Sequence, residues 1–254
     1  MQYGFHFDAW RCTGCKTCVL ACKDYQDNGT DVAYRQVYEY VGGSWGRDER
    51  GLWCQGSAGG PGADESANPD SSSATGGATD PGDPDKSGAS GSGAASGVGR
   101  TCFAWYVSVA CNHCARPVCV EVCPTGAMHK DAESGLVSVN ARRCVGCGYC
   151  ALSCPYHAPK VDRAAGRSVK CDGCLGRIAA GLAPICVAAC PVRALEFGEI
   201  GALRQRYGEL ADLAPLPDSG DTEPSLVITP PKAAELRTAG ELASGTIANL
   251  REIV

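Results

Sequence analysis

Sixteen of the eighteen cysteines in this protein fall into four short groups of four. The groups are, in order, Cys12, Cys15, Cys18 and Cys22; Cys111, Cys114, Cys119 and Cys123; Cys144, Cys147, Cys150 and Cys154; and Cys171, Cys174, Cys186 and Cys190. A proline follows the last cysteine in groups two, three and four. Thiolates are soft ligands for zinc, copper and iron. Thiols gathered this densely constrain the chain to fold around metal or to form a disulfide scaffold.

The spacing within the groups selects iron–sulfur clusters. Groups one and three have the C-x2-C-x2-C-x3-C run of bacterial iron–sulfur proteins. Three cysteines two residues apart can surround three corners of one cubane. In two-cluster ferredoxins the fourth cysteine, three residues on, ligates the other cluster. Sixteen thiolates are enough for four [4Fe-4S] clusters, which is the predicted cofactor content.

Two alternatives fit the spacing less well. Structural zinc uses paired C-x2-C knuckles with a longer spacer, and a third cysteine so close to each pair is not typical of it. A disulfide scaffold is typical of secreted chains, whereas Met1 leads into group one without a secretory or twin-arginine pattern. The two remaining cysteines, Cys54 and Cys102, are interpreted as free thiols, with a disulfide between them as the alternative.

Strand patterns between the groups indicate how the groups pair. Residues 127–129 and 136–139 are predicted to be two strands around a turn, like the hairpin between the cluster loops of a bacterial ferredoxin. Groups two and three therefore form one predicted ferredoxin-like unit. Strand-like runs at 3–8 and 194–198 flank groups one and four, and their pairing would build a second unit around the first. Spacing alone also allows group one to pair with group two, and group three with group four.

Composition limits both the conventional core and the class of partner. The chain has only four Phe and two Met, so bound clusters are expected to replace part of a hydrophobic core. The formal net charge is −5 before any cluster charge is added, which argues against nucleic-acid binding. No apolar stretch approaches the length of a membrane span, so membrane association is expected only through a partner.

Two segments stand apart from the cysteine groups. Residues 56–101 are mostly Gly, Ser, Ala, Pro and Asp, a composition that predicts a disordered insert. After a short helix expected at 200–208, the chain is Pro-rich and polar, as in a tail that wraps along a partner or along its own domain.

The predicted fold class is α+β, with two nested bacterial-ferredoxin-like units, a long disordered insert and an extended C-terminal tail. The predicted segments are 1–55 and 166–200 for the outer unit, 102–165 for the inner unit, 56–101 for the insert and 201–254 for the C-terminal extension.

The sequence shows no catalytic signature. It has no nucleophile elbow, phosphate-binding loop or dinucleotide fingerprint. The histidines at positions 113, 129 and 157 lie in or beside the cysteine loops and are interpreted as loop packing, because thiolates already fill every cluster corner. Some basic residues near the loops either tune the clusters or are ordinary surface charge; they are Arg11, Arg142, Arg143, Lys160 and Lys170. A chain of one-electron centres without a substrate site is predicted to carry electrons.

Several runs of residues together resemble one family. They are RCTGCKTC at 11–18, ACKDY at 21–25, YEY at 38–40 followed by GG at 42–43, CNHC at 111–114, CPTGAMHK at 123–130, KCDGC at 170–174, PIC at 184–186 and LAPLP at 213–217. On these runs the sequence resembles the iron–sulfur (B) subunits of dimethyl sulfoxide reductases, within the electron-transfer subunits of molybdopterin oxidoreductases. The resemblance covers nearly the whole sequence except residues 56–100. The insert and the pair Cys54 and Cys102 depart from it.

The resemblance implies a crossed set of cluster ligands, because this family pairs group one with group four and group two with group three. The implied sets are Cys12, Cys15, Cys18 and Cys190 for cluster 1; Cys22, Cys171, Cys174 and Cys186 for cluster 2; Cys111, Cys114, Cys119 and Cys154 for cluster 3; and Cys123, Cys144, Cys147 and Cys150 for cluster 4.

The resemblance also implies partners. An integral-membrane subunit that oxidises quinol is expected to pass electrons through the four clusters to a molybdopterin catalytic subunit. The protein itself is then a non-catalytic, peripheral subunit that is held at the membrane by its partners. The membrane face and the terminal substrate stay open.

Related subunits supply the alternatives. Nitrate reductase beta subunits carry Trp at the position of Cys147 and hold one three-iron cluster, and formate dehydrogenase beta subunits typically end in a membrane helix; this sequence differs from both. The equivalent subunit of a polysulfide reductase, a tetrathionate reductase or a hydrogenase stays open as an alternative. A zinc-binding interaction module is the alternative from another class.

Overall fold

The first strand of the protein, β1 (Tyr3–Asp8), lies between two strands from its far end. It pairs antiparallel with β10 (Leu195–Glu199) and parallel with β11 (Leu226–Thr229), in the sheet order β10-β1-β11. The predicted pairing of the strand before group one with the strand after group four is confirmed. Strand β11 was not predicted. Its Leu-Val-Ile-Thr run lies inside the Pro-rich tail, and Val227 is completely buried.

The computed structural model describes residues 1–43, 45–47, 53–55, 102–236 and 239–252. The protein divides into two compact units, 1–43 with 102–254, and 44–101. In the second unit the strands β3 (Trp45–Arg47) and β4 (Trp53–Gln55) pair antiparallel. The predicted disordered insert at 56–101 lies outside the described residues. The side chain of Cys54 also lies outside the described residues, so a disulfide between Cys54 and Cys102 stays an alternative.

A second sheet of the larger unit supplies most of its aromatic core. Strand β2 (Gln36–Gly42) pairs antiparallel with β5 (Phe103–Val109), and β12 (Thr246–Ile247) pairs with the other edge of β2. Tyr40, Phe103 and Trp105 pack together, with the Phe103 and Trp105 ring centroids 4.9 Å apart. The same core includes Phe5 and Phe7 of β1.

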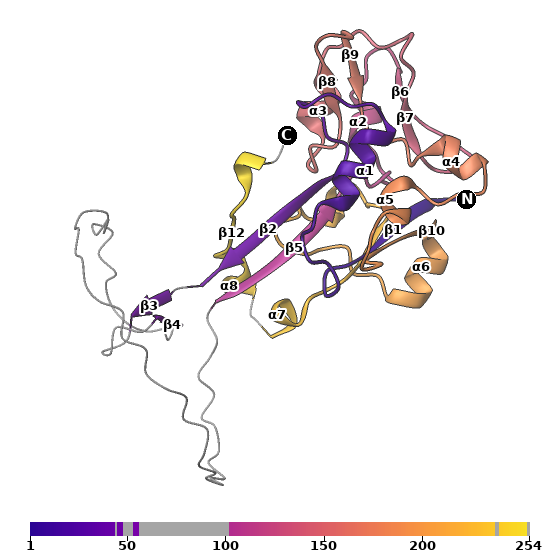
Figure 1. The fold of residues 1–254 in the computed structure, drawn as a ribbon. Helices are drawn as coiled ribbons and strands as arrows, with labels where there is room; N and C mark the ends of the chain where they lie inside the picture. Colours follow the sequence, from indigo (N-terminus) through magenta and orange to yellow (C-terminus); the bar gives the residue numbers. More distant parts are fainter. Residues whose placement is uncertain (44, 48–52, 56–101, 237–238, 253–254) are drawn as a thin grey trace, which may run out of the picture. The chain divides into compact units, whose positions relative to one another are not determined.

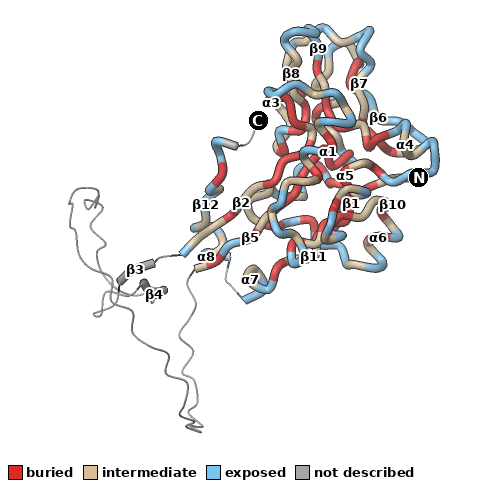
Figure 2. Tube along the Cα trace, in the orientation of Figure 1, coloured by how far each residue is buried: buried red, intermediate tan, exposed pale blue. Residues whose placement is uncertain are grey.

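Short helices lie in or beside the cysteine groups, and four of them pack in two pairs. The helices are α1 (Thr17–Tyr25), α2 (Val118–Glu121), α3 (Tyr149–Ser153), α4 (Leu175–Ala179) and α5 (Ile185–Ala188). Helix α1, which begins in group one, packs against α5 of group four, and α2 of group two packs against α3 of group three. Buried positions gather around α1, α5 and β1 (Figure 2).

Two hairpins lie at one end of this unit (Figure 1). Strands β6 (Met128–Lys130) and β7 (Val137–Val139) form the hairpin predicted between groups two and three, within one residue of the predicted bounds. Strands β8 (Lys160–Asp162) and β9 (Arg167–Val169) form another between groups three and four, which was not predicted. The strand before group two, β5, pairs with β2, so in the predicted inner unit the flanking strands pair differently from those of the predicted outer one.

The C-terminal extension packs on its own domain. The predicted helix is confirmed as α6 (Ile200–Tyr207), and its Ile200 and Leu203 are buried with Val227 of β11. A 3-10 turn, η1 (Ser219–Asp221), precedes β11. After β11 come α7 (Lys232–Glu235), α8 (Ala239–Ala243) and a second 3-10 turn, η2 (Leu250–Glu252). None of the helices in the described part of the protein is both long and apolar enough to cross a membrane.

Candidate metal centres

All four cysteine groups share one backbone feature. The residue before the second cysteine has a positive φ in every group, namely Gly14 (68°), His113 (45°), Gly146 (67°) and Gly173 (76°). Glycine adopts this conformation without the steric cost that other residues incur, which explains its presence in three of the four loops. At Gly146 an added Cβ would also lie 2.5 Å from the backbone oxygen of Gly166. The four loops therefore turn in the same way at the same point.

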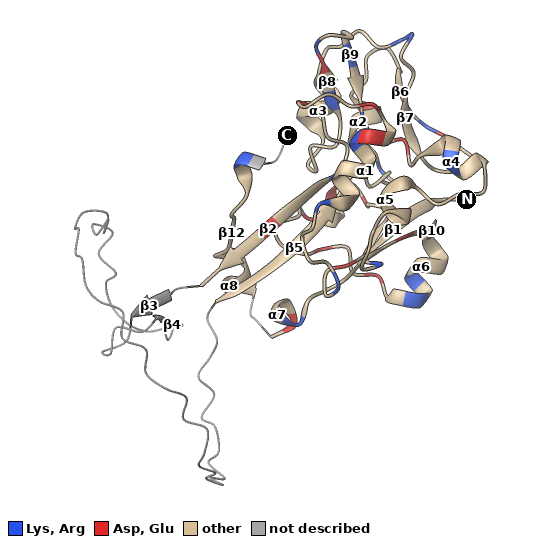
Figure 3. Ribbon diagram, in the orientation of Figure 1, with Lys and Arg blue, Asp and Glu red and all other residues tan. Residues whose placement is uncertain are grey.

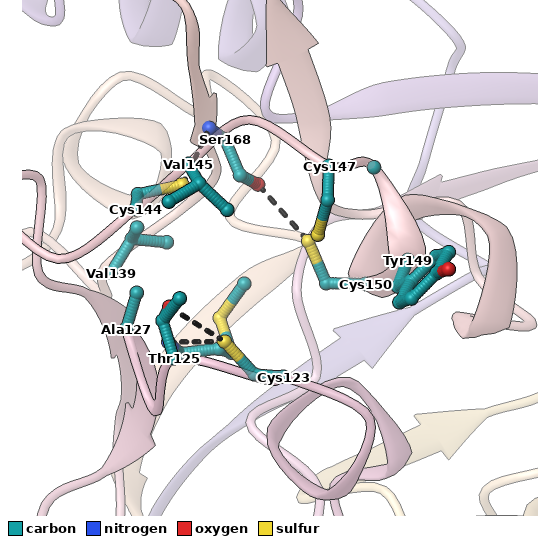
Figure 4. A pocket seen from close by; sticks show the side chains of 12 residues that line it. Cys123, Thr125, Ala127, Val139, Cys144, Val145, Cys147, Tyr149, Cys150 and Ser168 are labelled. Carbon is teal, nitrogen blue, oxygen red and sulfur yellow. Dashed lines mark hydrogen bonds between the residues drawn. The ribbon is translucent and has the colours of Figure 1, made fainter.

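Three thiols of group three surround a cavity together with one thiol of group two. Cys144, Cys147 and Cys150 line it from one loop, and Cys123 lines it from the other (Figure 4). The space around these thiols is about 330 Å³, part of which is open to solvent. The cavity thus brings together the four residues implied as ligands of cluster 4.

A second cavity has the same composition at the other cysteine loops. Cys12, Cys15 and Cys18 line it with Cys190 of group four, and the space around them, part of which is open to solvent, is about 310 Å³. These are the residues implied as ligands of cluster 1. Two cavities of nearly equal size, each lined by three thiols of one group and one thiol of another, suit two occupants of the same kind.

Backbone N–H groups point at several of these sulfurs. The amide of Met128 donates to Cys123 Sγ at 3.3 Å, that of Ser168 to Cys144 Sγ at 3.2 Å, and that of Ala194 to Cys190 Sγ at 3.3 Å. In the implied set of cluster 2, the amide of Gly173 approaches Cys171 Sγ at 3.4 Å. Such bonds stabilise thiolate ligands and influence the reduction potential of an iron–sulfur cluster. The donor set therefore fits [4Fe-4S] clusters.

The other two implied sets lie deeper in the protein. Cys119 is buried, and burial raises the pKa of its thiol to about 12, with ionised Cys111, Cys154 and Cys114 acting in the same direction. These four residues are the implied ligands of cluster 3. Thiols that repel one another when ionised need a positive centre, which bound iron would supply.

The implied set of cluster 2 behaves in the same way. Burial raises the pKa of the Cys22 thiol to about 12, and ionised Cys186 and Cys174 add to the effect. Cys171, the fourth member, is fully buried, and burial raises its thiol pKa far above the ordinary value. Among the residues that the structure describes, no group of three or more His, Cys, Asp or Glu side chains is arranged to hold a single metal ion.

His113 packs between two loops, as the sequence indicated. Its Nδ1 accepts a hydrogen bond from the Val137 amide at 2.9 Å, and its Nε2 lies 4.0 Å from Cys171 Sγ. Burial lowers its pKa well below the ordinary value, and Lys170 and Lys130 lower it further. The ring is therefore neutral, with its proton on Nε2, facing the sulfur.

The basic residues near the loops divide into buried and exposed ones. Lys170 is buried, and its Nζ donates to the backbone oxygens of Val137 and Cys171. Arg11, by contrast, is exposed and pairs with Asp8 at 3.3 Å. The helices α4 and α6 carry basic residues (Figure 3), among them the exposed Arg206.

Sequence reasoning missed Arg35, although it is among the most buried cations of the described residues. It precedes β2, outside every cysteine loop, and only 2% of its surface is exposed. Spacing gives no signal for it, because its position depends on the packing of β2, β5 and α1.

Comparisons with known proteins agree with this geometry. The model of the 4Fe-4S dicluster domain family matches residues 102–200, which contain groups two, three and four. The protein is 45% identical over 252 residues to the B subunit of the anaerobic dimethyl sulfoxide reductase of Haemophilus influenzae, covering 99% of each. The subunit of the same name from Escherichia coli is 42% identical, with 99% of this protein and 98% of the relative covered.

This protein belongs to the family of dimethyl sulfoxide reductase B subunits. It is an iron–sulfur electron-transfer subunit of the oxidoreductase class and is not itself the catalytic subunit. A more distant relative is the thiosulfate reductase electron transfer subunit of Salmonella typhi. It is 46% identical over 96 residues, which is 37% of this protein and 50% of that one.

Proposed function

We propose that this subunit carries electrons singly through four [4Fe-4S] clusters, between a quinol-oxidising membrane subunit and a molybdopterin catalytic subunit of a dimethyl sulfoxide reductase-type enzyme. The observation that carries this proposal is the composition of the two cavities. Each is lined by four cysteines, three from one loop and one from another. Each cluster, when bound, accepts and releases one electron, and the protein's own residues supply ligands, hydrogen bonds and spacing.

The proposed ligands are the four crossed sets implied by the family resemblance. Cluster 1 is held by groups one and four, and cluster 4 by groups two and three. The packing of α1 on α5 and of α2 on α3 supports the same pairing, because each helix pair joins the groups that would share clusters. The β1–β10 pairing supports it further, because it brings the strand before group one beside the strand after group four. Together these contacts favour two nested ferredoxin-like units, with 56–101 as an insert outside them.

The proposed clusters follow one another in a line from 1 to 4. Helix α1 carries Cys18 of the first set and Cys22 of the second. Cys171 of the second set and Cys111 of the third share one buried cluster of side chains. Cys119 of the third set and Cys150 of the fourth share another. Neighbouring sets are thus joined by direct packing, which suits transfer from one cluster to the next.

Only the end sets of this line contain an exposed cysteine among the described residues. They are Cys15 in the first set and Cys147 in the last. Large exposed apolar side chains lie in the same loops, with Trp10 near the first and Tyr149 near the last. Electrons therefore have an entry point and an exit point at opposite ends of the line, where each partner subunit would dock. The protein is held at the membrane through such a partner.

Co-expression with a molybdopterin subunit and a membrane subunit of this enzyme class tests the proposal. We expect the three to purify together, a menaquinol analogue to reduce the clusters, and an added sulfoxide to reoxidise them only when the catalytic subunit is present. Thiosulfate is the control oxidant, because a thiosulfate reductase subunit is among the relatives. Clusters that the quinol analogue leaves oxidised in the assembled complex would overturn the proposed electron path.

A further inference from the structure

A fully buried guanidinium lies among the thiols of two proposed clusters. Arg35 is 2% exposed, and none of the ion pairs formed among the described residues includes it. Its Nη1 donates to Ser108 Oγ at 3.1 Å, and its Nε has no hydrogen-bond partner. Its charged end also lies 5.2 Å from the ring centroid of Phe5. A guanidinium stays charged in proteins, so this burial is strongly unfavourable unless anions lie close by.

Cysteine thiols that can ionise lie near Arg35, because Phe5, whose ring Arg35 contacts, packs in one buried cluster with Cys18 and Cys186. Burial acts to lower the pKa of Arg35, but ionised Cys186, Cys18, Cys171 and Cys22 outweigh burial and raise it. Cys18 belongs to the proposed ligands of cluster 1, and the other three belong to those of cluster 2. Ser108 extends the contact to cluster 1, because its Oγ lies 3.4 Å from Cys18 Sγ.

We propose that Arg35, held by Ser108, is the buried cation that raises the reduction potentials of clusters 1 and 2 together. This inference rests on the proposed function. A reduced cluster carries one more negative charge than an oxidised one, so a fixed positive charge favours electron uptake. The effect is strong because the site is shielded from water. The exposed Arg11, beside the same loop, acts through solvent and salt and has much less influence.

The test is a redox titration of the holoprotein, followed by electron paramagnetic resonance. In the wild type, about sixteen irons and four one-electron waves must be present, on the four-cubane count. Their absence would overturn the proposed function rather than this inference. In Arg35→Met we expect two waves to move to lower potential by at least about 59 mV, which is a tenfold change in the equilibrium constant of a one-electron reduction. The other two waves should stay in place.

Two variants are matched controls. Arg35→Lys keeps the charge, so its potentials should lie close to those of the wild type. Arg11→Gln removes an exposed charge and should move each wave far less than Arg35→Met does. The inference fails if all four waves of Arg35→Met stay in place with about sixteen irons retained, on the four-cubane count. It also fails if Arg35→Lys shifts them as far as Arg35→Met.

A second pair of variants carries the test if Arg35→Met does not assemble. Ser108→Ala removes the hydroxyl between Arg35 and Cys18, and Ser108→Thr keeps it. We expect Ser108→Ala to lower the potential of one wave, that of cluster 1, and Ser108→Thr to leave all four in place. An unchanged set of waves in Ser108→Ala would overturn the proposal.

Discussion

Gly42 and Phe103 lie directly opposite each other in the antiparallel pair of β2 and β5. The backbone leaves the larger unit just after Gly42 and re-enters it just before Phe103. The described residues on either side of 44–101, Gly43 and Cys102, therefore continue two neighbouring strands, at a separation that a hairpin turn spans.

Replacement of residues 44–101 by a short Asn-Gly turn should leave the clusters intact. The β2–β5 pairing already fixes both ends, and all sixteen proposed ligands lie outside the segment. Iron content and the visible spectrum of the shortened protein should match those of the full-length protein. Loss of any cluster would show that this segment supports cluster binding.

Gly146→Ala should remove cluster 4, whereas Gly166→Ala should not. Both glycines have a positive φ, so each alanine has a backbone cost of about 1 kcal/mol. At Gly146 the new Cβ would also lie 2.5 Å from a backbone oxygen, while at Gly166 nothing lies within 4 Å. The comparison of iron content and thermal midpoints isolates the clash. Equal effects of the two substitutions would show that backbone strain alone determines the outcome.

Cys147→Trp should convert one cubane to a three-iron cluster. Cys147 is the exposed thiol of the cavity lined by Cys123, Cys144 and Cys150, and a tryptophan removes that ligand. We expect iron to fall from about sixteen to about fifteen per protein molecule, and the oxidised protein to gain a three-iron paramagnetic signal. Val145→Trp, an exposed neighbour on the same cavity, is the control and should keep the full count. An unchanged count in Cys147→Trp would mean that Cys147 is not a ligand.

Protonation of His6 should destabilise the protein in mild acid. His6 stacks on Tyr207 at 3.6 Å and shares a 2.9 Å hydrogen bond with Thr229 Oγ1. Burial lowers its pKa below 6.5, and Arg206 contributes in the same direction, while Asp8 and Glu196 oppose the shift. The unfolded state therefore binds a proton before the folded state does. The stability contributed by neutral His6 is fully present above pH 6.5 and is lost as the pH falls towards the folded-state pKa.

Thermal midpoints between neutral and mildly acidic pH measure this effect. His6→Gln keeps a hydrogen-bonding group toward Thr229 and should show a smaller acid-dependent fall than the wild type. The thermal midpoint of His129→Gln, a change at an exposed histidine, should fall with acid as that of the wild type does. Parallel curves for His6→Gln and the wild type would contradict the role given to His6.

The parts of the fold that depend on local spacing were predictable from the sequence. The β6–β7 hairpin and helix α6 both follow from short patterns of turn-forming and apolar residues. The β1–β10 pairing was also predicted, because two short strands flank the outer cysteine groups.

The parts that depend on distant packing were not predictable. Strand β11 is only four residues long and has prolines close to both ends, so its own sequence gives little strand signal. It forms because it pairs with the edge of β1 that β10 does not occupy. The β8–β9 hairpin is local, but each of its strands, Lys160–Asp162 and Arg167–Val169, contains a single apolar residue, so no strand pattern marks it in the sequence. Arg35 belongs to no motif, and its position among the thiols arises only when α1, β2 and β5 pack together.

The iron and acid-labile sulfide content of the anaerobically purified full-length protein tests the central claim most directly. Four cubanes held by sixteen thiolates require a brown protein with about sixteen irons and about sixteen sulfides per molecule. A colourless protein with bound zinc, or a content fixed near that of two cubanes, would contradict the account.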